Sequence, residues 1–135
     1  CDMRISSANA RYGMPEIKLG LYPGYGGAQR LPRLIGKGKA FYLMMTGEIV
    51  TSKEAEDWGI VDFVFEPTVF TEKVEEIAQS ISKQSNKGLA KLKRSVNKGL
   101  DMPLDEAIHE DARTIGELMV TEEVREKAAS FVNKS

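Results

Sequence analysis

The stretch Tyr12-Gly-Met-Pro-Glu16-Ile-Lys-Leu-Gly20-Leu-Tyr-Pro-Gly24-Tyr-Gly-Gly27-Ala-Gln-Arg-Leu-Pro-Arg-Leu-Ile-Gly36 decides the interpretation of this chain. Prolines and glycines are too frequent between Pro15 and Gly27 for one regular helix or strand, so this part is predicted to be a loop. Its glycines let the backbone adopt unusual dihedral angles or approach another group closely. Glu16 is the one carboxylate in this loop.

Glu16 is therefore the candidate catalytic group. A carboxylate beside apolar side chains is suited to proton transfer, and nearby glycine amides could hold a water or an acyl oxygen because no Cβ keeps such a group away. The competing interpretation is structural, since a lone glutamate in a glycine-rich loop commonly caps a backbone amide or a helix. The residues alone leave both interpretations open.

Short regular elements are predicted on both sides of the loop. Residues 3–13 alternate loosely and turn near residues 8–10, which predicts two short strands. A short helix interrupted by Pro32 is expected over residues 28–35. The next helix is predicted over residues 37–46 and ends at a glycine.

A capping box and a β-branched segment follow. Thr51 and Glu54 have the spacing of the capping box, which predicts a small helix over residues 52–57 closed by Gly59. Residues 60–65 are β-branched and aromatic, so they predict a short strand.

The part of the chain after Pro67 is predicted to be helical, because apolar residues recur at helical spacing in four successive stripes. Asn86 is expected to cap the second helix and Pro103 to take the first position of the third, and the fourth is expected to begin near Thr121. The chain therefore divides into residues 1–66, which carry the Glu16 loop, and a helical region over residues 67–135. Such stripes need a covering surface, so we expect these helices to pack on further structure or on another subunit.

Composition excludes several classes of function. The chain has 19 basic and 20 acidic residues and a net charge of −1, so no field of one sign attracts nucleic acid or an anionic membrane. Cys1 is the only cysteine, which excludes an intrachain disulfide and favours a reducing, cytoplasmic location. No apolar run approaches the roughly 18 residues that span a bilayer, and no signal-peptide pattern is present. We expect neither nucleic acid nor a membrane as a partner.

Other chemistries fit the sequence poorly. The glycines before residue 28 match neither the dinucleotide fingerprint nor the ending of a P-loop. The only histidine, His109, is expected on a helix surface, so neither a Ser-His-Asp triad nor a metal site can be built around it. Arg30 and Arg33 are interpreted either as ligands of a phosphate or as residues whose salt bridges fix the loop or a subunit contact.

The order Pro-Glu16, Leu-Gly20, Pro-Gly24-x-Gly-Gly27 and Gln-Arg-Leu resembles the enoyl-CoA hydratase/isomerase family. The resemblance continues through Thr46-Gly47, through residues 55–61 with their ending Trp-Gly-Ile-Val, and through residues 125–134. It implies the crotonase-type α/β spiral fold. This chain would supply its C-terminal part, with short strands followed by a mostly helical C-terminal region.

The resemblance also implies an activity, the reversible hydration of trans-2-enoyl-CoA to 3-hydroxyacyl-CoA in metabolism of the fatty-acid β-oxidation type. Glu16 matches the glutamate that exchanges a proton with the acyl α-carbon, and Gly24 matches the position whose amide helps hold the catalytic water. No metal or redox cofactor is implied, since CoA arrives as part of the acyl-CoA thioester substrate. Expected substrate contacts are Leu21, Pro23 and Tyr25 along the acyl pocket, and Phe131 and Lys134 near the CoA nucleotide.

Two departures from the family pattern limit this expectation. The first hydratase glutamate and both oxyanion-hole amides precede Cys1 in the family pattern, and one such amide is worth on the order of 3 kcal/mol. The chain alone is therefore expected to be a poor catalyst. A double-bond isomerase that uses Glu16 alone and a noncatalytic oligomerisation module remain the alternatives. For the intact protein the resemblance implies a homotrimer, or a hexamer built as a dimer of trimers.

Overall fold

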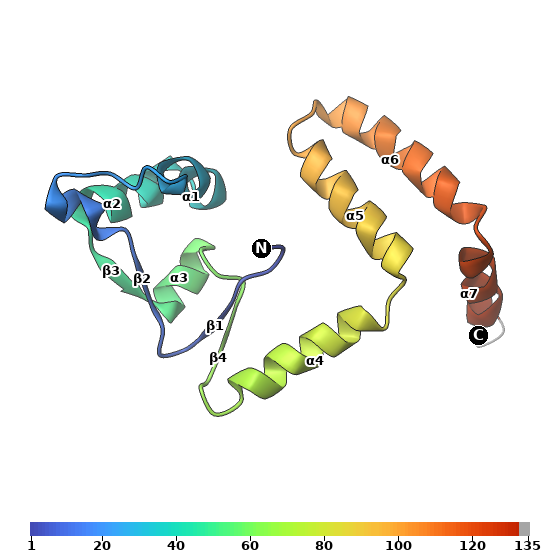
Figure 1. The fold of residues 1–135 in the computed structure, drawn as a ribbon, viewed down its shortest axis with the longest axis horizontal. Helices are drawn as coiled ribbons and strands as arrows, with labels where there is room; N and C mark the ends of the chain where they lie inside the picture. The colour runs from blue at the N-terminus through green and yellow to red at the C-terminus, as the bar shows by residue number, and fades with distance from the viewer. Residues whose placement is uncertain (133–135) are drawn as a thin grey trace. The chain divides into compact units, whose positions relative to one another are not determined.

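The structure is a computed structural model that describes residues 1–132. It contains two compact units, one formed by Cys1–Ala78 and one that begins at Gln79. Figure 1 shows the order of the elements along the chain, from β1 in blue to α7 in red. Among the residues described, no helix is long and apolar enough to cross a membrane.

Four short strands form two separate two-stranded sheets in the first unit. Strand β1 (Ile5–Ser7) pairs in parallel with β4 (Phe63–Phe65), and β2 (Arg11–Gly13) pairs antiparallel with β3 (Ile49–Thr51). The two strands predicted over residues 3–13 are therefore confirmed, although they do not pair with each other.

The last strand of the first unit is shorter than its sequence predicts. Ile60 and Val61 do not join β4, because both backbone amides donate to the Ala55 carbonyl oxygen, at 2.7 and 3.3 Å. The β-branched segment is thus divided between the turn that closes the preceding helix and the strand itself.

Three α-helices and one 3₁₀ turn complete the framework of the first unit. They are η1 (Pro15–Leu19), α1 (Gly27–Ile35), α2 (Lys37–Thr46) and α3 (Ser52–Trp58). The predicted interruption at Pro32 is wrong. Proline removes only one N–H from the helix, and the Pro32 carbonyl oxygen still accepts a hydrogen bond of 3.0 Å from the Gly36 amide.

The capping box is confirmed at the start of α3. The Thr51 side chain accepts a hydrogen bond from the Glu54 amide, and the Glu54 carboxylate accepts one from the Thr51 amide. The helix extends one residue beyond the prediction, to Trp58, and ends at Gly59 in the left-handed conformation, with φ of 80°. Helix α2 ends in the same way at Gly47, with φ of 62°.

The apolar core of the first unit lies among α1, α2, α3 and β3. A buried polar group accompanies it, since the Ser52 hydroxyl donates to the carbonyl oxygen of Ser7 at 2.7 Å and lies 3.2 Å from the Ser6 hydroxyl. The seven buried apolar residues described there are Leu31, Ala40, Leu43, Met44, Val50, Ala55 and Val61.

Helices make up the rest of the chain. Helix α4 (Phe70–Ser82) begins in the first unit, and α5 (Asn86–Gly99), α6 (Leu104–Met119) and α7 (Glu122–Val132) follow in the second. The predicted cap at Asn86 is wrong by one residue, because the Ser85 hydroxyl accepts the hydrogen bond from the Gly88 amide. Pro103 likewise stands just before α6 rather than at its first position.

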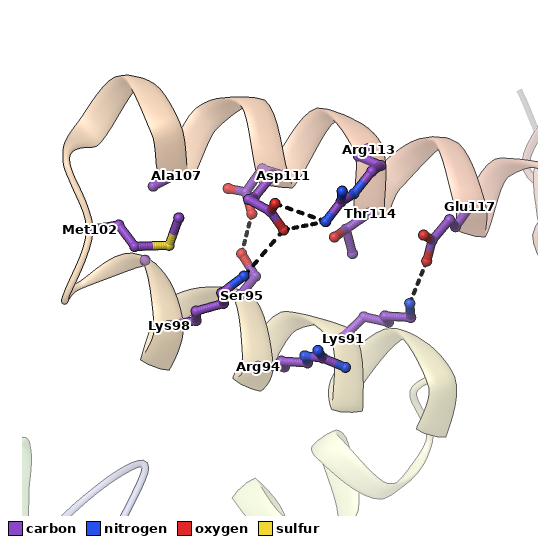
Figure 2. A pocket seen from close by; sticks show the side chains of 12 residues that line it. Lys91, Arg94, Ser95, Lys98, Met102, Ala107, Asp111, Arg113, Thr114 and Glu117 are labelled. Atoms are coloured by element: carbon purple, nitrogen blue, oxygen red, sulfur yellow. Dashed lines mark hydrogen bonds and ion pairs between the residues drawn. The ribbon is translucent and has the colours of Figure 1, made fainter.

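A row of ion pairs, which we call the α5–α6 seam, joins these two helices (Figure 2). Lys91 Nζ lies 2.6 Å from Glu117 Oε2, and Lys98 Nζ lies 3.4 Å from Glu110 Oε2. The hydrogen bond from Lys91 holds the pKa of Glu117 below its ordinary value. A hollow of about 130 Å³ lies among these side chains. Because both lysines are already paired with carboxylates, we assign the hollow to the α5–α6 seam, which has a structural role.

Large apolar side chains of the second unit remain exposed. Each is more than half exposed, although the sequence pattern placed several of them on inward-facing stripes. These residues are Leu92, Val96, Leu100, Leu104, Ile108, Ile115, Met119 and Val120.

Candidate functional site

Strand β2 leads directly into the segment that carries Glu16. Gly13 pairs with Ile49 of β3 at the end of the strand. A Cβ atom at Gly13 would lie 2.8 Å from the Glu48 carbonyl oxygen, so only glycine permits this approach of the two backbones. The close pairing fixes the chain three residues before Glu16.

The η1 turn that contains Glu16 packs on the end of α2. Pro15 is its first residue, which suits the fixed φ of proline. A Cβ atom at Gly47 would lie 3.0 Å from Lys18 Cε and 3.1 Å from Ile17 Cγ2, so the turn rests closely on the glycine that ends α2. The position of Glu16 therefore depends on two glycines of neighbouring elements.

The Glu16 carboxylate is the candidate reactive group. Its Oε2 atom is buried and has no hydrogen-bond partner among the residues that the structure describes. The Glu16 backbone is held, because its carbonyl oxygen accepts a hydrogen bond of 3.1 Å from the Leu21 amide. A buried polar oxygen without a partner is uncommon in folded proteins and is a candidate for contact with a ligand or water.

The loop after η1 has one buried residue and several exposed ones. Pro23 is buried, whereas Leu21 is 61% exposed and Tyr25 is fully exposed. Leu19 is also 80% exposed. Leu19 and Leu21, which the sequence places near Glu16, are thus mostly exposed, and two of the three expected acyl-pocket residues are free to contact a ligand.

Gly24 lies at the tip of this loop and is exposed. Its Cβ position would be 3.6 Å from the ring of Tyr22, so that ring covers one side of the residue. No residue that the structure describes accepts a hydrogen bond from the Gly24 amide. The amide is thus available to an acceptor from outside the chain.

Arg30 holds the loop from α1. Its Nη2 donates a hydrogen bond of 2.8 Å to the Tyr25 carbonyl oxygen. Gly26 lies beneath the guanidinium, with φ of 93°, and a Cβ atom there would lie 2.5 Å from Arg30 Nη2. Among the roles left open for Arg30, the structure shows that it holds the loop, through a hydrogen bond to a backbone oxygen and not through the expected salt bridge.

The remaining candidates lie elsewhere. Phe131 falls within α7, and Lys134 lies outside the described residues. His109 is exposed on α6, as expected, with its Nδ1 atom 2.6 Å from the Asp105 carbonyl oxygen. Within the described part of the chain, no group of three or more His, Cys, Asp or Glu residues could hold a metal ion.

Comparison with known proteins shows the family to which the chain belongs. Residues 1–135 match the family described as enoyl-CoA hydratase/isomerase. The chain is 38% identical over 131 residues to a short-chain-enoyl-CoA hydratase of Clostridioides difficile, which covers 97% of this chain and 84% of that relative. It is 37% identical to a short-chain-enoyl-CoA hydratase of Clostridium acetobutylicum, over 99% of this chain and 51% of that protein.

Solved structures show the same fold. A crystal structure of enoyl-CoA hydratase from Bacillus anthracis superposes with a TM-score of 0.93 at 33% identity, over 99% of this chain and 52% of that one. A Geobacillus kaustophilus structure gives 0.91 at 36% identity, over 99% and 52%. The chain thus has the crotonase-type α/β fold and spans about half the length of most of these relatives. Since the family match covers every residue, the chain belongs to the enoyl-CoA hydratase/isomerase family.

Proposed function

We propose that the protein containing this chain catalyses the reversible addition of water to a trans-2-enoyl-CoA, which gives a 3-hydroxyacyl-CoA. The observation that carries the proposal is the buried Glu16 Oε2, which lacks a hydrogen-bond partner among the described residues. Relatives that are named short-chain-enoyl-CoA hydratase support the substrate class.

Glu16 is the proposed proton donor and acceptor at the acyl α-carbon. In hydration the oxygen of water bonds to C3, and C2 gains a proton. The proton that the water gives up passes to a base that we assign to groups outside residues 1–135, so the net change is one water consumed for each double bond. A carboxyl group in contact with C2 supplies that proton and recovers it in the reverse direction. The absence of competing hydrogen bonds leaves Glu16 Oε2 free for this exchange.

The Gly24 amide is the proposed anchor for the reacting water. It is exposed and donates to no described residue, so a water oxygen can accept its hydrogen bond. Leu21 and Tyr25 are exposed on the same loop and are proposed to line the acyl chain, while the buried Pro23 shapes the backbone between them. Phe131 and Lys134 are proposed contacts of the CoA nucleotide.

Polarisation of the thioester carbonyl is assigned to groups outside residues 1–135. This part of the proposal rests on the family resemblance and on the length of the relatives, of which the chain spans about half. Two amides that donate to the developing enolate oxygen would complete the site. CoA enters as part of the substrate, and the reaction is proposed to need no metal or redox cofactor.

Self-association is proposed through the second unit. Eight described apolar side chains on α5 and α6 and at the residue after each of these helices are more than half exposed and would be costly to leave in water, at about 25 cal/mol for each Å². A homotrimer, or a hexamer of two trimers, is the assembly proposed to cover them. The single cysteine supports a cytoplasmic location.

The test uses this chain joined to the upstream half of the Bacillus anthracis relative, here called the completed enzyme. Loss of crotonyl-CoA absorbance is measured for the completed enzyme, its Glu16→Gln variant and the 135-residue chain alone. We expect hydration by the completed enzyme, none by the variant, and little or none by the chain alone. A completed enzyme that assembles but leaves crotonyl-CoA unchanged would contradict the proposal.

A double-bond isomerase is the second candidate. The observation that favours it is that the Pro15–Gly27 segment carries one carboxylate, and an isomerase needs one group to move a proton between C2 and C4. A completed enzyme that converts 3-enoyl-CoA to 2-enoyl-CoA without hydrating it would establish this activity. Inactivity in both assays, with intact self-association, would instead indicate a noncatalytic oligomerisation module.

A further inference from the structure

Gly27 lies where the two parts of the proposed site meet. A Cβ atom at Gly27 would lie 2.8 Å from Pro23 Cβ and 3.1 Å from both Sδ and Cε of Met14. Met14 stands two residues before Glu16, and Pro23 stands immediately before Gly24. A single glycine therefore touches the segment that carries the carboxylate and the segment that carries the free amide.

The two neighbours of Gly27 are both anchored. Pro23 is buried, its ring is rigid, and its carbonyl oxygen accepts a hydrogen bond of 3.0 Å from the Ala28 amide. Met14 has a flexible side chain but packs against the apolar core of the first unit. A distance of 2.8 Å is shorter than real Cβ contacts allow, so an added methyl group would displace Pro23, Met14 or both.

No side-chain hydrogen bond fixes the Glu16 Oε2 atom among the described residues. No described residue donates a hydrogen bond to Glu16 Oε2, so packing of the backbone around it, and not a side-chain partner, sets its position. The Gly24 amide is equally without a described acceptor. The distance between the Glu16 carboxylate and the Gly24 amide thus depends on how closely the Met14 and Pro23 segments pack against Gly27.

We infer that Gly27 is a positioning residue, whose lack of a side chain sets the separation between the Glu16 carboxylate and the Gly24 amide. The inference rests on the proposed function, because the separation matters for catalysis only if both groups act on the same reactants. Gly38 is the matched control. It also lies in the first turn of a helix, and a Cβ atom there would meet nothing within 4 Å.

The first experiment needs no activity. NMR on the 135-residue chain measures the shift of the Gly24 amide resonance that Glu16→Gln causes, first in the unsubstituted chain and then in the Gly27→Ala and Gly38→Ala backgrounds. We expect the amide to respond to Glu16 in the unsubstituted chain, Gly27→Ala to change the amplitude of the response, and Gly38→Ala to preserve it. An equal amplitude in Gly27→Ala and the unsubstituted chain would overturn the inference.

The second experiment measures hydration kinetics in the completed enzyme. Gly27→Ala is expected to lower kcat by on the order of tenfold or more with little change in KM, since a misplacement of about 1 Å can cost a hundredfold. Gly38→Ala should leave both constants unchanged. An active enzyme whose kcat survives Gly27→Ala would refute the positioning role.

The two experiments also separate the inference from the proposed function. A changed amide response in an enzyme that hydrates nothing would uphold the positioning geometry and reject the proposed reaction. If Gly27→Ala fails to fold, Met14→Ala carries the test, because it removes one of the two contacts without adding atoms. A fall in kcat without a rise in KM is expected there too, and an unchanged kcat would count against the inference.

Discussion

The Arg30 guanidinium donates a hydrogen bond of 2.8 Å to the Tyr25 carbonyl oxygen and lies across Gly26. Because Gly26 has no Cβ, the guanidinium can approach the backbone directly. The contact closes the turn between the tip of the loop and α1. It therefore restrains the Tyr25–Gly26 peptide unit, one residue after Gly24.

Arg30→Ala should release this turn. We expect faster hydrogen exchange at the amides of residues 24–27 and lower hydratase activity in the completed enzyme, because the proposed water anchor becomes mobile. Arg33→Ala is the matched control, since Arg33 donates to the Gln29 carbonyl oxygen one turn away on the exposed side of α1. If Arg30 instead bound a phosphate of the substrate, Arg30→Ala would raise KM and leave exchange in the loop unchanged.

Glu16→Gln should separate stability from activity. The substitution removes no hydrogen bond from Oε2 within the described chain, so the free energy of unfolding should stay within about 0.5 kcal/mol or increase. Urea unfolding followed by fluorescence of Trp58, the only tryptophan, reports on the first unit. Destabilisation by about 2 kcal/mol or more would show that Glu16 has a structural partner and would weaken its catalytic assignment.

Gly47→Ala should cost more stability than Gly59→Ala. Both glycines end helices in the left-handed conformation, which costs a residue with a Cβ roughly 1 kcal/mol. Only at Gly47 would the Cβ also press on the η1 turn, at 3.0 Å from Lys18 and 3.1 Å from Ile17. The Trp58 unfolding assay should therefore show a larger loss at residue 47, and equal losses would mean that the turn yields freely.

Thr51→Ala should destabilise α3 by about 1 kcal/mol, the usual cost of losing a threonine cap.

The hydrogen bond from the Thr51 amide, with a second from its hydroxyl, holds the pKa of Glu54 below its ordinary value of 4.5. The folded pKa is lower than the unfolded one, so this contribution is present above pH 4.5 and is lost as the pH falls through the folded pKa. Glu54→Gln should abolish that pH dependence, and a variant that keeps it would assign the effect to another carboxylate.

Local patterns predicted the elements well where one short motif determines them. The capping box at Thr51 and Glu54 placed the start of α3, and glycine placed the ends of α2 and α3. Predictions failed where neighbouring hydrogen bonds decide the outcome. The amides of Ile60 and Val61 close a helix instead of extending β4, and the chain continues as a helix through Pro32 because one missing N–H is tolerated.

The candidate site, too, could be predicted from the sequence only in part. The loop, its carboxylate and its glycines were evident from composition, since breakers so close together exclude regular structure. The contacts of Gly27 with Met14 and Pro23 were not evident. They join residues thirteen and four positions apart through packing, which leaves no periodic pattern in the sequence. The hydrogen bond from Arg30 to Tyr25 depends in the same way on the left-handed turn at Gly26.

The parallel pairing of β1 with β4 has a consequence for how the chain acquires its structure. Ile5 is paired with Phe63, so this sheet cannot form until Phe63 has been synthesised and the long loop between the two residues has closed. Lys91 and Glu117, which join α5 and α6, are much nearer to each other along the sequence. Since non-local pairing slows folding, the helical hairpin should form rapidly, whereas the unit that carries Glu16 should mature last.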